Sequence, residues 1–254
     1  MSRFWSDTAV MASRNFRRTM RLPEMVVFAT IQPIMFVVLF RYVFGGAIET
    51  GDLDYVNFLL PGIFVQTVAF GSFGTALGLT EDLQKGVVDR FRSLPMRHGT
   101  VVLGRIINDM SVNTLSMIVM VLVGLLVGYR PEGSAAELTL GFLLVLLISL
   151  SFSWVSASMG LALRTVEAVN SFGFIWMFPL TFVSSAFVPV ETMPSWLQGF
   201  AENQPFTRMV DAVRGLSAGT PDPNDVWAAI LWCVLIIAIF LPLSMRQFHR
   251  AGGR

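Results

Sequence analysis

The sequence predicts an all-α integral membrane protein with six transmembrane helices, and three observations support this fold class. First, 54% of its 254 residues are hydrophobic and only 14% are charged, whereas about a quarter are charged in an ordinary soluble domain. Second, several apolar runs approach the ~20 residues that a helix needs to cross a hydrocarbon layer of ~30 Å. Third, Lys and Arg gather in alternate connections between these runs, as expected of cytoplasmic loops.

The expected spans follow one another along the whole chain. They cover residues 26–44, 58–79, 108–127, 138–161, 169–188 and 226–243. With the N-terminus inside, the outer side holds four of the 18 cationic residues, namely Arg41, Arg130, Arg208 and Arg214. The other fourteen lie on the inner side. Because cytoplasmic connections carry the excess of Lys and Arg, and the number of spans is even, both termini are expected in the cytoplasm.

An amphipathic stretch precedes the first span. Residues 1–23 interleave apolar residues with arginines and are predicted to form an interfacial helix along the inner leaflet, with a frayed basic tail as the alternative. The side chains expected at this interface are Phe4, Trp5, Arg14, Phe16, Arg17 and Arg18. No apolar h-region comes before these arginines, so a cleavable signal peptide is not expected.

The most polar connection lies between the second and third spans. Residues 81–97 are too charged for hydrocarbon and must stand in water. Leu83, Val87 and Phe91 recur every four residues, which places them along one side of a helix. The pattern predicts a short amphipathic helix that docks into a soluble partner, and a solvated connector is the alternative.

A long apolar connection joins the fifth and sixth spans. Residues 189–225 contain five prolines and apolar residues spaced as in short, interrupted helices. We expect two short helices that lie on the outer face or dip into it and pack against the bundle.

Several kinds of chemistry lack the residues they need. The one lysine, Lys85, is followed by Gly-Val, so the chain has no G-x-x-x-x-G-K-[ST] loop for ATP phosphates. His98 and His249 form neither a metal-spaced cluster nor a Ser-His-Asp group. We therefore expect no catalytic residue, no metal and no cofactor in this chain. Cys233 lies in an apolar run, where a packing role is expected.

Charges inside the spans are few. Arg105 and Asp109 are spaced i, i+4 and can neutralise each other at the cytoplasmic edge of the membrane. No expected span carries an acidic residue near its middle, where ion-driven carriers place coupling groups. An ion-coupled carrier therefore remains only an alternative, as does a membrane-embedded enzyme.

Two motifs resemble a known family. Residues 81–96 read EDLxxGxxDRFRSLPM, followed by LGR at 103–105 and Asp109, and resemble the cytoplasmic-loop signature of ABC-2-type export permeases. More narrowly, they are similar to the daunorubicin/doxorubicin-resistance permeases common in actinobacteria. Residues 189–197 read PVETMPxWL, followed by NxPxT at 203–207 and DxxR at 211–214, and resemble the family's outer re-entrant region. The resemblance covers essentially the whole chain and implies a single transmembrane domain, residues 1–254.

The resemblance implies a division of labour in a bacterial cytoplasmic membrane. Two copies of a separate ATPase subunit bind ATP and Mg²⁺, and a second permease, identical or paralogous, completes a shared pathway. The N-terminal interfacial helix and residues 81–92 then contact the ATPase, the latter as the coupling helix. Its residues are Glu81, Asp82, Leu83, Lys85, Gly86, Val87, Asp89, Arg90, Phe91 and Arg92. No nucleic acid is expected among the partners.

The substrate pathway is expected to be aromatic and rich in methionine. Its candidate residues are Phe64, Phe70, Phe73, Phe172, Phe174, Trp176, Met177 and Phe178. Such a pliable apolar lining suits an amphipathic drug or a lipid, moved outward. Export of a polysaccharide or lipid-linked glycan is the rival function within the family. For the residues themselves, packing against lipid or neighbouring helices is the alternative.

Overall fold

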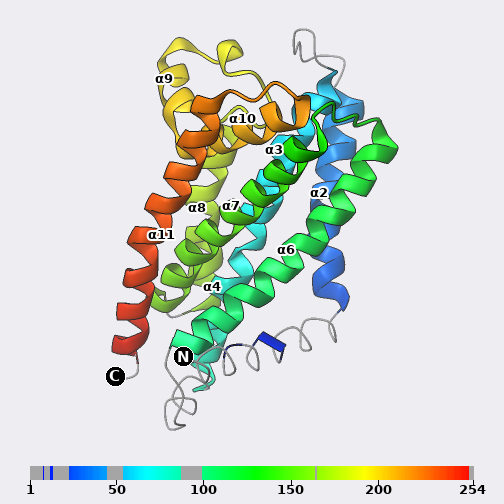
Figure 1. Ribbon diagram of the computed structural model, residues 1–254. Helices are drawn as coiled ribbons and strands as arrows, with labels where there is room; N and C mark the ends of the chain where they lie inside the picture. The colour runs from blue at the N-terminus through cyan, green and yellow to red at the C-terminus, as the bar shows by residue number, and fades with distance from the viewer. Residues whose placement is uncertain are drawn as a thin grey trace.

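The computed structural model describes residues 8, 12–13, 23–44, 54–86, 99–163 and 165–251. Every regular element within these ranges is a helix, which confirms the all-α prediction (Figure 1). In chain order the elements are α2 (Pro23–Leu39), η1 (Phe40–Phe44), α3 (Tyr55–Gly71), α4 (Phe73–Gln84), α6 (Gly99–Val127), α7 (Ala135–Ala162), α8 (Val166–Phe182), η2 (Val190–Thr192), α9 (Ser195–Asn203), α10 (Pro205–Ala218) and α11 (Pro223–Ala251).

Four helical stretches are long and apolar enough to cross a membrane. They are the continuous path Tyr55–Gln84, the helices Gly99–Val127 and Ala135–Ala162, and Pro223–Arg250. These coincide with the second, third, fourth and sixth expected spans. The helices α2 and α8, of 17 residues each, fall where the first and fifth spans are expected. The count of six crossings therefore stays a prediction.

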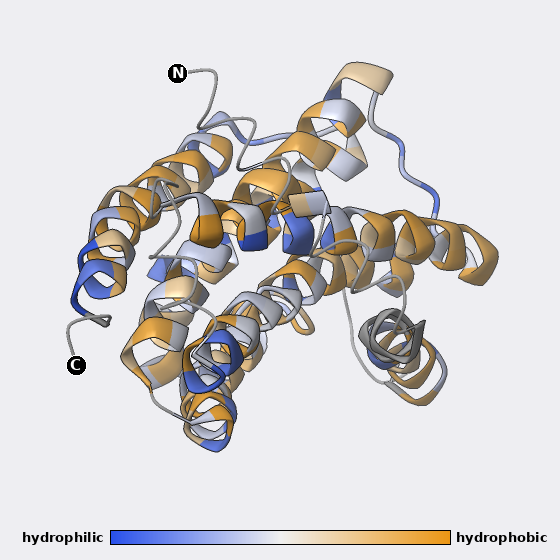
Figure 2. Cartoon of the chain, turned by 90° about the horizontal axis from the view of Figure 1, so that it is seen from below, coloured by the Kyte–Doolittle hydropathy of each residue, from blue (hydrophilic) through white to orange (hydrophobic). Residues whose placement is uncertain are grey.

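Hydrophobic side chains cover the outer faces of the helices as well as their contacts. Viewed from below, hydrophobic residues are distributed around the helices and do not form a single inward stripe (Figure 2). Large apolar side chains are exposed on α2, α6, α8 and α11, among them Met35, Leu122, Ile175 and Leu231. A helix that is apolar all round belongs in hydrocarbon or in a protein core. The exposed faces therefore suit a lipid environment.

The helix α7 occupies the centre of the bundle, where it packs against α3, α4, α6, α10 and α11. Its first turn is fixed by a capping box, in which Ser134 and Glu137 satisfy each other's backbone N–H groups. Near its other end, α7 approaches α4 so closely that a Cβ on Gly160 would overlap the backbone of Ala76. Small residues allow such close approach between membrane helices.

Between α8 and α11 the chain forms the short 3-10 helix η2 and two short α-helices, α9 and α10, where two short helices were expected over residues 189–225. The longer one, α10, begins with Pro205 at its first turn and ends at Gly219, whose φ of 74° suits a left-handed C-cap. It buries Phe206, Met209 and Val213 against α3, α7 and α11. In Figure 1, α9 and α10 sit together at one end of the bundle, which we call the α10 end. Where the bilayer lies relative to them stays a prediction.

Two expected elements lie wholly or partly outside the residues that the structure describes. The interfacial helix over residues 1–23, including Phe4, Trp5, Arg14, Phe16, Arg17 and Arg18, lies outside the described residues except for positions 8, 12, 13 and 23. The second half of the expected coupling helix, with Val87, Asp89, Arg90, Phe91 and Arg92, also lies outside them.

Candidate functional site

A cavity of about 310 Å³ opens between five helices and is the main candidate site. Its lining comes from α2, α3, α4, α6 and α8. One side, the aromatic wall, consists of Phe36, Phe70, Phe73 and Phe174. The polar lining residues on α3 and α6, which we call the polar wall, are Gln66, Thr67, Arg105, Asn108, Asp109, Asn113 and Ser116.

The aromatic wall is held by ring contacts between α3, α4 and α8. The centre of the Phe70 ring lies 6.0 Å from that of Phe73 and 6.2 Å from those of both Phe174 and Phe178. Ring centroids at 4.5–7 Å are in the range of favourable aromatic pairs. A Cβ on Gly173 would overlap the Phe73 ring, so the absence of a side chain there lets the ring pack against α8.

The structure brings together only some of the expected pathway residues. Phe70, Phe73 and Phe174 line the cavity, and Phe178 contacts Phe70 behind it. Trp176 packs against Phe73 and Phe152, outside the lining.

Three further pathway candidates lie outside this cavity. Phe64 and Met177 are buried in the main core, and Phe172 points outward, exposed, away from the cavity lining. Hydropathy marks all of these positions alike because it carries no information on which way a side chain faces.

The polar wall follows one face of α6. Arg105, Asp109 and Asn113 are spaced four residues apart, and Asn108 and Ser116 fall beside them on the same face. The Asp109 carboxylate accepts hydrogen bonds from Thr75 Oγ1 at 2.5 Å and Asn108 Nδ2 at 3.0 Å, and lies 3.8 Å from Arg105 Nε. Its charge is therefore compensated inside the protein.

The same polar groups tie α6 to its neighbours. Arg105 Nη2 donates to the Gly74 carbonyl at 2.9 Å, and Asn113 Nδ2 donates to the Val68 carbonyl at 3.3 Å and to Ser149 Oγ at 2.9 Å. These contacts join α6 to α4, α3 and α7, respectively. The polar wall is thus fixed in place by hydrogen bonds to three neighbouring helices.

The helix that carries this wall is longer than the span expected from the sequence. The third span was expected to begin at residue 108, with Arg105 and Asp109 at the edge of the membrane. In the structure α6 begins at Gly99, and both side chains are largely buried within the bundle; their depth in the membrane stays a prediction. Nor did the sequence assign the wall a role, although the spacing of Arg105, Asp109 and Asn113 in an apolar helix was a usable signal. Among the described residues, no group of three or more His, Cys, Asp or Glu side chains gathers as metal ligands.

The first half of the expected coupling helix also differs from expectation. Residues 81–84 are the last turn of α4, which ends through Lys85 and Gly86, and Gly86 has a φ of 63°. Glu81 pairs with Lys85 at 3.0 Å on the surface, whereas Asp82 is 6% exposed. Leu83 packs against the core cluster around Leu79. Asp82 and Leu83 therefore belong to the body of the protein, because the α4 helix continues past the hydropathy boundary at residue 79.

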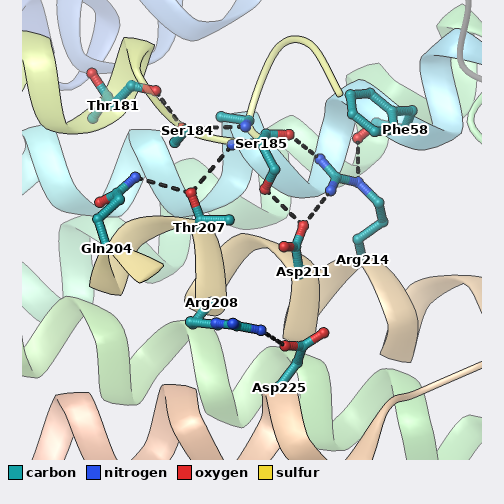
Figure 3. Close-up of polar contacts among 11 residues, drawn as sticks. Phe58, Thr181, Ser184, Ser185, Gln204, Thr207, Arg208, Asp211, Arg214 and Asp225 are labelled. Carbon is teal, nitrogen blue, oxygen red and sulfur yellow. Dashed lines mark hydrogen bonds and ion pairs between the residues drawn. The ribbon is translucent and has the colours of Figure 1, made fainter. Parts of the chain in front are cut away.

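A second polar group, the α10 cluster, lies at the α10 end (Figure 3). It is centred on Arg214, which donates to Asp211 Oδ1 at 2.6 Å, to the Ser185 carbonyl at 2.5 Å and to the Phe58 carbonyl at 3.0 Å. The guanidinium also lies 3.8 Å from the centre of the Phe58 ring. Burial lowers the pKa of Arg214 to about 10, so the guanidinium stays charged at neutral pH.

Other members of the α10 cluster attach α10 to the ends of two more helices. Ser185 Oγ donates to Asp211 at 2.7 Å, and burial raises the pKa of this carboxyl. Gln204 Nε2 donates to the carbonyls of Leu180 and Val183 at 3.1 and 3.2 Å, at the end of α8. Arg208 pairs with Asp225 of α11 at 2.7 Å. The DxxR motif at 211–214 thus fixes α10 to α3 and to the segment after α8.

Comparisons with known proteins agree with this architecture. The family model described as ABC-2 type transporter matches residues 6–217. The chain is 32% identical over 245 residues to daunorubicin resistance ABC transporter permease protein DrrB1 of Streptomyces coeruleorubidus, covering 96% of this chain and 84% of that protein. It is 21% identical over 252 residues to probable doxorubicin resistance ABC transporter permease protein DrrC of Mycobacterium tuberculosis strain H37Rv, covering 98% and 90%.

A relative from another lineage matches as well. Putative transport permease ycf38 of Cyanophora paradoxa is 28% identical over 218 residues, covering 84% of this chain and 74% of that protein. The family match spans most of the chain and includes every helix that lines the cavity. The chain therefore belongs to the ABC-2 type transporter family and is a membrane permease.

Proposed function

We propose that this permease moves an apolar or amphipathic molecule, a drug or a lipid, outward across a bacterial cytoplasmic membrane. The observation that carries the proposal is the cavity between α2, α3, α4, α6 and α8, with its aromatic wall and its internally compensated polar wall. Its volume of about 310 Å³ lies at the lower end of the range of small-molecule sites, roughly 300–1,000 Å³. The names of two relatives, which mention daunorubicin and doxorubicin resistance, support a drug-like cargo.

The energy for transport comes, in this proposal, from a separate ATPase subunit in two copies, each binding ATP and Mg²⁺. The absence of a phosphate-binding loop from the sequence supports this division. A second permease, identical or paralogous, faces the first and completes the pathway. The chain crosses the membrane six times, with both termini in the cytoplasm and residues 189–225 at the outer face.

Coupling to the ATPase is assigned to residues 81–97 together with the N-terminal interfacial helix. The path of α4 supports this assignment, because the helix runs from Phe73 in the aromatic wall into this segment and ends there at Gln84. A push on residues 81–97 therefore has a continuous helix through which to reach the cavity.

The test is transport of the fluorescent dye Hoechst 33342 into inverted membrane vesicles that contain the permease and its ATPase. We expect ATP-dependent uptake. Phe70→Ala should weaken it roughly threefold to tenfold, because the variant loses one ring of the aromatic wall and that ring's contacts with its neighbours. Leu126→Ala is the control, since this exposed side chain lies on α6 outside the cavity.

Equal uptake by the Phe70 and Leu126 variants would show that the cavity is not the transport site. Uptake that does not require ATP would contradict the exporter assignment.

A further inference from the structure

Two buried, uncharged polar side chains at the cavity have no hydrogen-bond partner among the described residues. Gln66 on α3 and Ser116 on α6 line the cavity and are 6% and 2% exposed. Within the described part of the chain, the Ser116 hydroxyl has no partner and no hydrogen bond involves the Gln66 amide. Since buried polar groups are almost always hydrogen-bonded, two exceptions at one cavity need an explanation.

Neighbouring hydroxyl groups bond the backbone of their own helix, but Ser116 does not. A hydroxyl on a helix commonly bonds the carbonyl four residues earlier, and on α6 Ser111 and Thr114 do so at 2.8 and 2.7 Å. Thr67, next to Gln66, does the same with the Ile63 carbonyl at 2.7 Å. Ser116 makes no such bond, so its hydroxyl remains available to a molecule in the cavity.

The rest of the polar wall makes contacts within the protein, except that Arg105 Nε has no hydrogen-bond partner among the described residues. Asp109 is held by Thr75, Asn108 and Arg105, and Asn113 is held by Val68 and Ser149. The two charged groups of the wall, Arg105 and Asp109, are paired with each other. With these two charges compensating each other, the uncharged groups that the wall offers a ligand are an amide and a hydroxyl, each able both to donate and to accept.

We infer that Gln66 and Ser116 form the subsite that selects a transported molecule by an uncharged hydroxyl or carbonyl group. The rings of Phe70 and Phe174 hold the apolar body of that molecule. This inference rests on the proposed function, because it assigns specificity to the same cavity. It predicts that a neutral hydrogen-bonding group raises apparent affinity.

The test uses the permease assembled with its ATPase in lipid nanodiscs and two probes that differ by one hydroxyl, pyrene and 1-hydroxypyrene. The measurement is the concentration of each probe that half-maximally stimulates ATP hydrolysis. For the unaltered protein we expect 1-hydroxypyrene to act at roughly threefold to tenfold lower concentration, the worth of one or two neutral hydrogen bonds. Gln66→Leu and Ser116→Ala should each reduce this ratio toward one.

Ser111→Ala is the matched control, because its hydroxyl lies on the same helix, outside the cavity, and bonds its own backbone. It should leave the ratio unchanged. The two subsite variants are independent, so if one fails to assemble with the ATPase, the other still decides the question.

Three outcomes would overturn the inference. If the unaltered protein responds equally to both probes, or if both subsite variants keep its preference, the hydroxyl is not recognised here and the proposed function stands. If neither probe stimulates the unaltered complex, the proposed transport of apolar and amphipathic molecules through this cavity fails, and the subsite fails with it.

Discussion

Replacing Arg214 with methionine removes the centre of the α10 cluster while keeping most of the side-chain volume. The guanidinium makes hydrogen bonds to three different segments, and only 11% of its side chain is exposed. In the variant, the Asp211 carboxylate and the carbonyls of Ser185 and Phe58 lose a charged donor at once. The change therefore leaves a largely buried charge without its counterion.

The size of the effect follows from this burial. Removing one partner of a buried ion pair typically costs about 3–5 kcal/mol. The side chain of Asp211 keeps 29% exposure, so water replaces part of the lost interaction, and we expect the lower end, about 3 kcal/mol. Replacing Asp211 with leucine as well removes the uncompensated charge, so the double variant should recover about 1–2 kcal/mol.

The assay is unfolding of the purified permease in mixed micelles with increasing SDS, followed by circular dichroism. Arg208→Met is the control, because the Arg208–Asp225 pair is more exposed, at 36% and 20%, and should cost about 1 kcal/mol or less. If Arg214→Met and Arg208→Met unfold at the same SDS fraction, the α10 cluster does not stabilise the fold in the way we argue.

Three further predictions concern packing, topology and coupling. Gly160→Val should destabilise the same unfolding transition by about 1–3 kcal/mol, because its side chain meets the α4 backbone. Gly199→Ala, in open space, should have little effect, and equal losses would argue against the close contact. A cysteine at Asp52 should react with an impermeant maleimide in intact cells and one at Gly99 should not, whereas the reverse pattern would invert the proposed orientation. Phe91→Ala should lower recovery of the ATPase in pull-downs by removing an apolar anchor from the proposed interface, and normal recovery would favour a solvated connector.

The positions of the helices could be predicted from the sequence because hydrocarbon imposes a minimum length on apolar runs. Their ends could not, since a helix continues past the membrane wherever the backbone allows it. Thus α4 runs on to Gln84 and stops at the left-handed Gly86, while α6 starts at Gly99.

The direction in which each side chain points could not be predicted from the sequence either. Phe70 and Phe64 are equally apolar, and only tertiary packing puts one at the cavity and the other in the core. The polar wall could be predicted in part, because polar residues such as Asp109 and Asn113 in an apolar helix require partners. Which partners they have depends on α3, α4 and α7, which are distant in sequence.

The amide of Gln204 has a consequence for how the short helix α8 meets lipid. With 17 residues, α8 is about 25 Å long, less than the ~30 Å thickness of a hydrocarbon layer. A helix that stops short leaves carbonyls at a depth where lipid provides no donor. Gln204 provides one from another segment, to Leu180 and Val183. In the proposed topology, in which α8 is the fifth span, tertiary structure therefore supplies the donors that lipid cannot, and a deletion between η2 and α10 should expose these carbonyls to solvent even though it leaves α8 itself untouched.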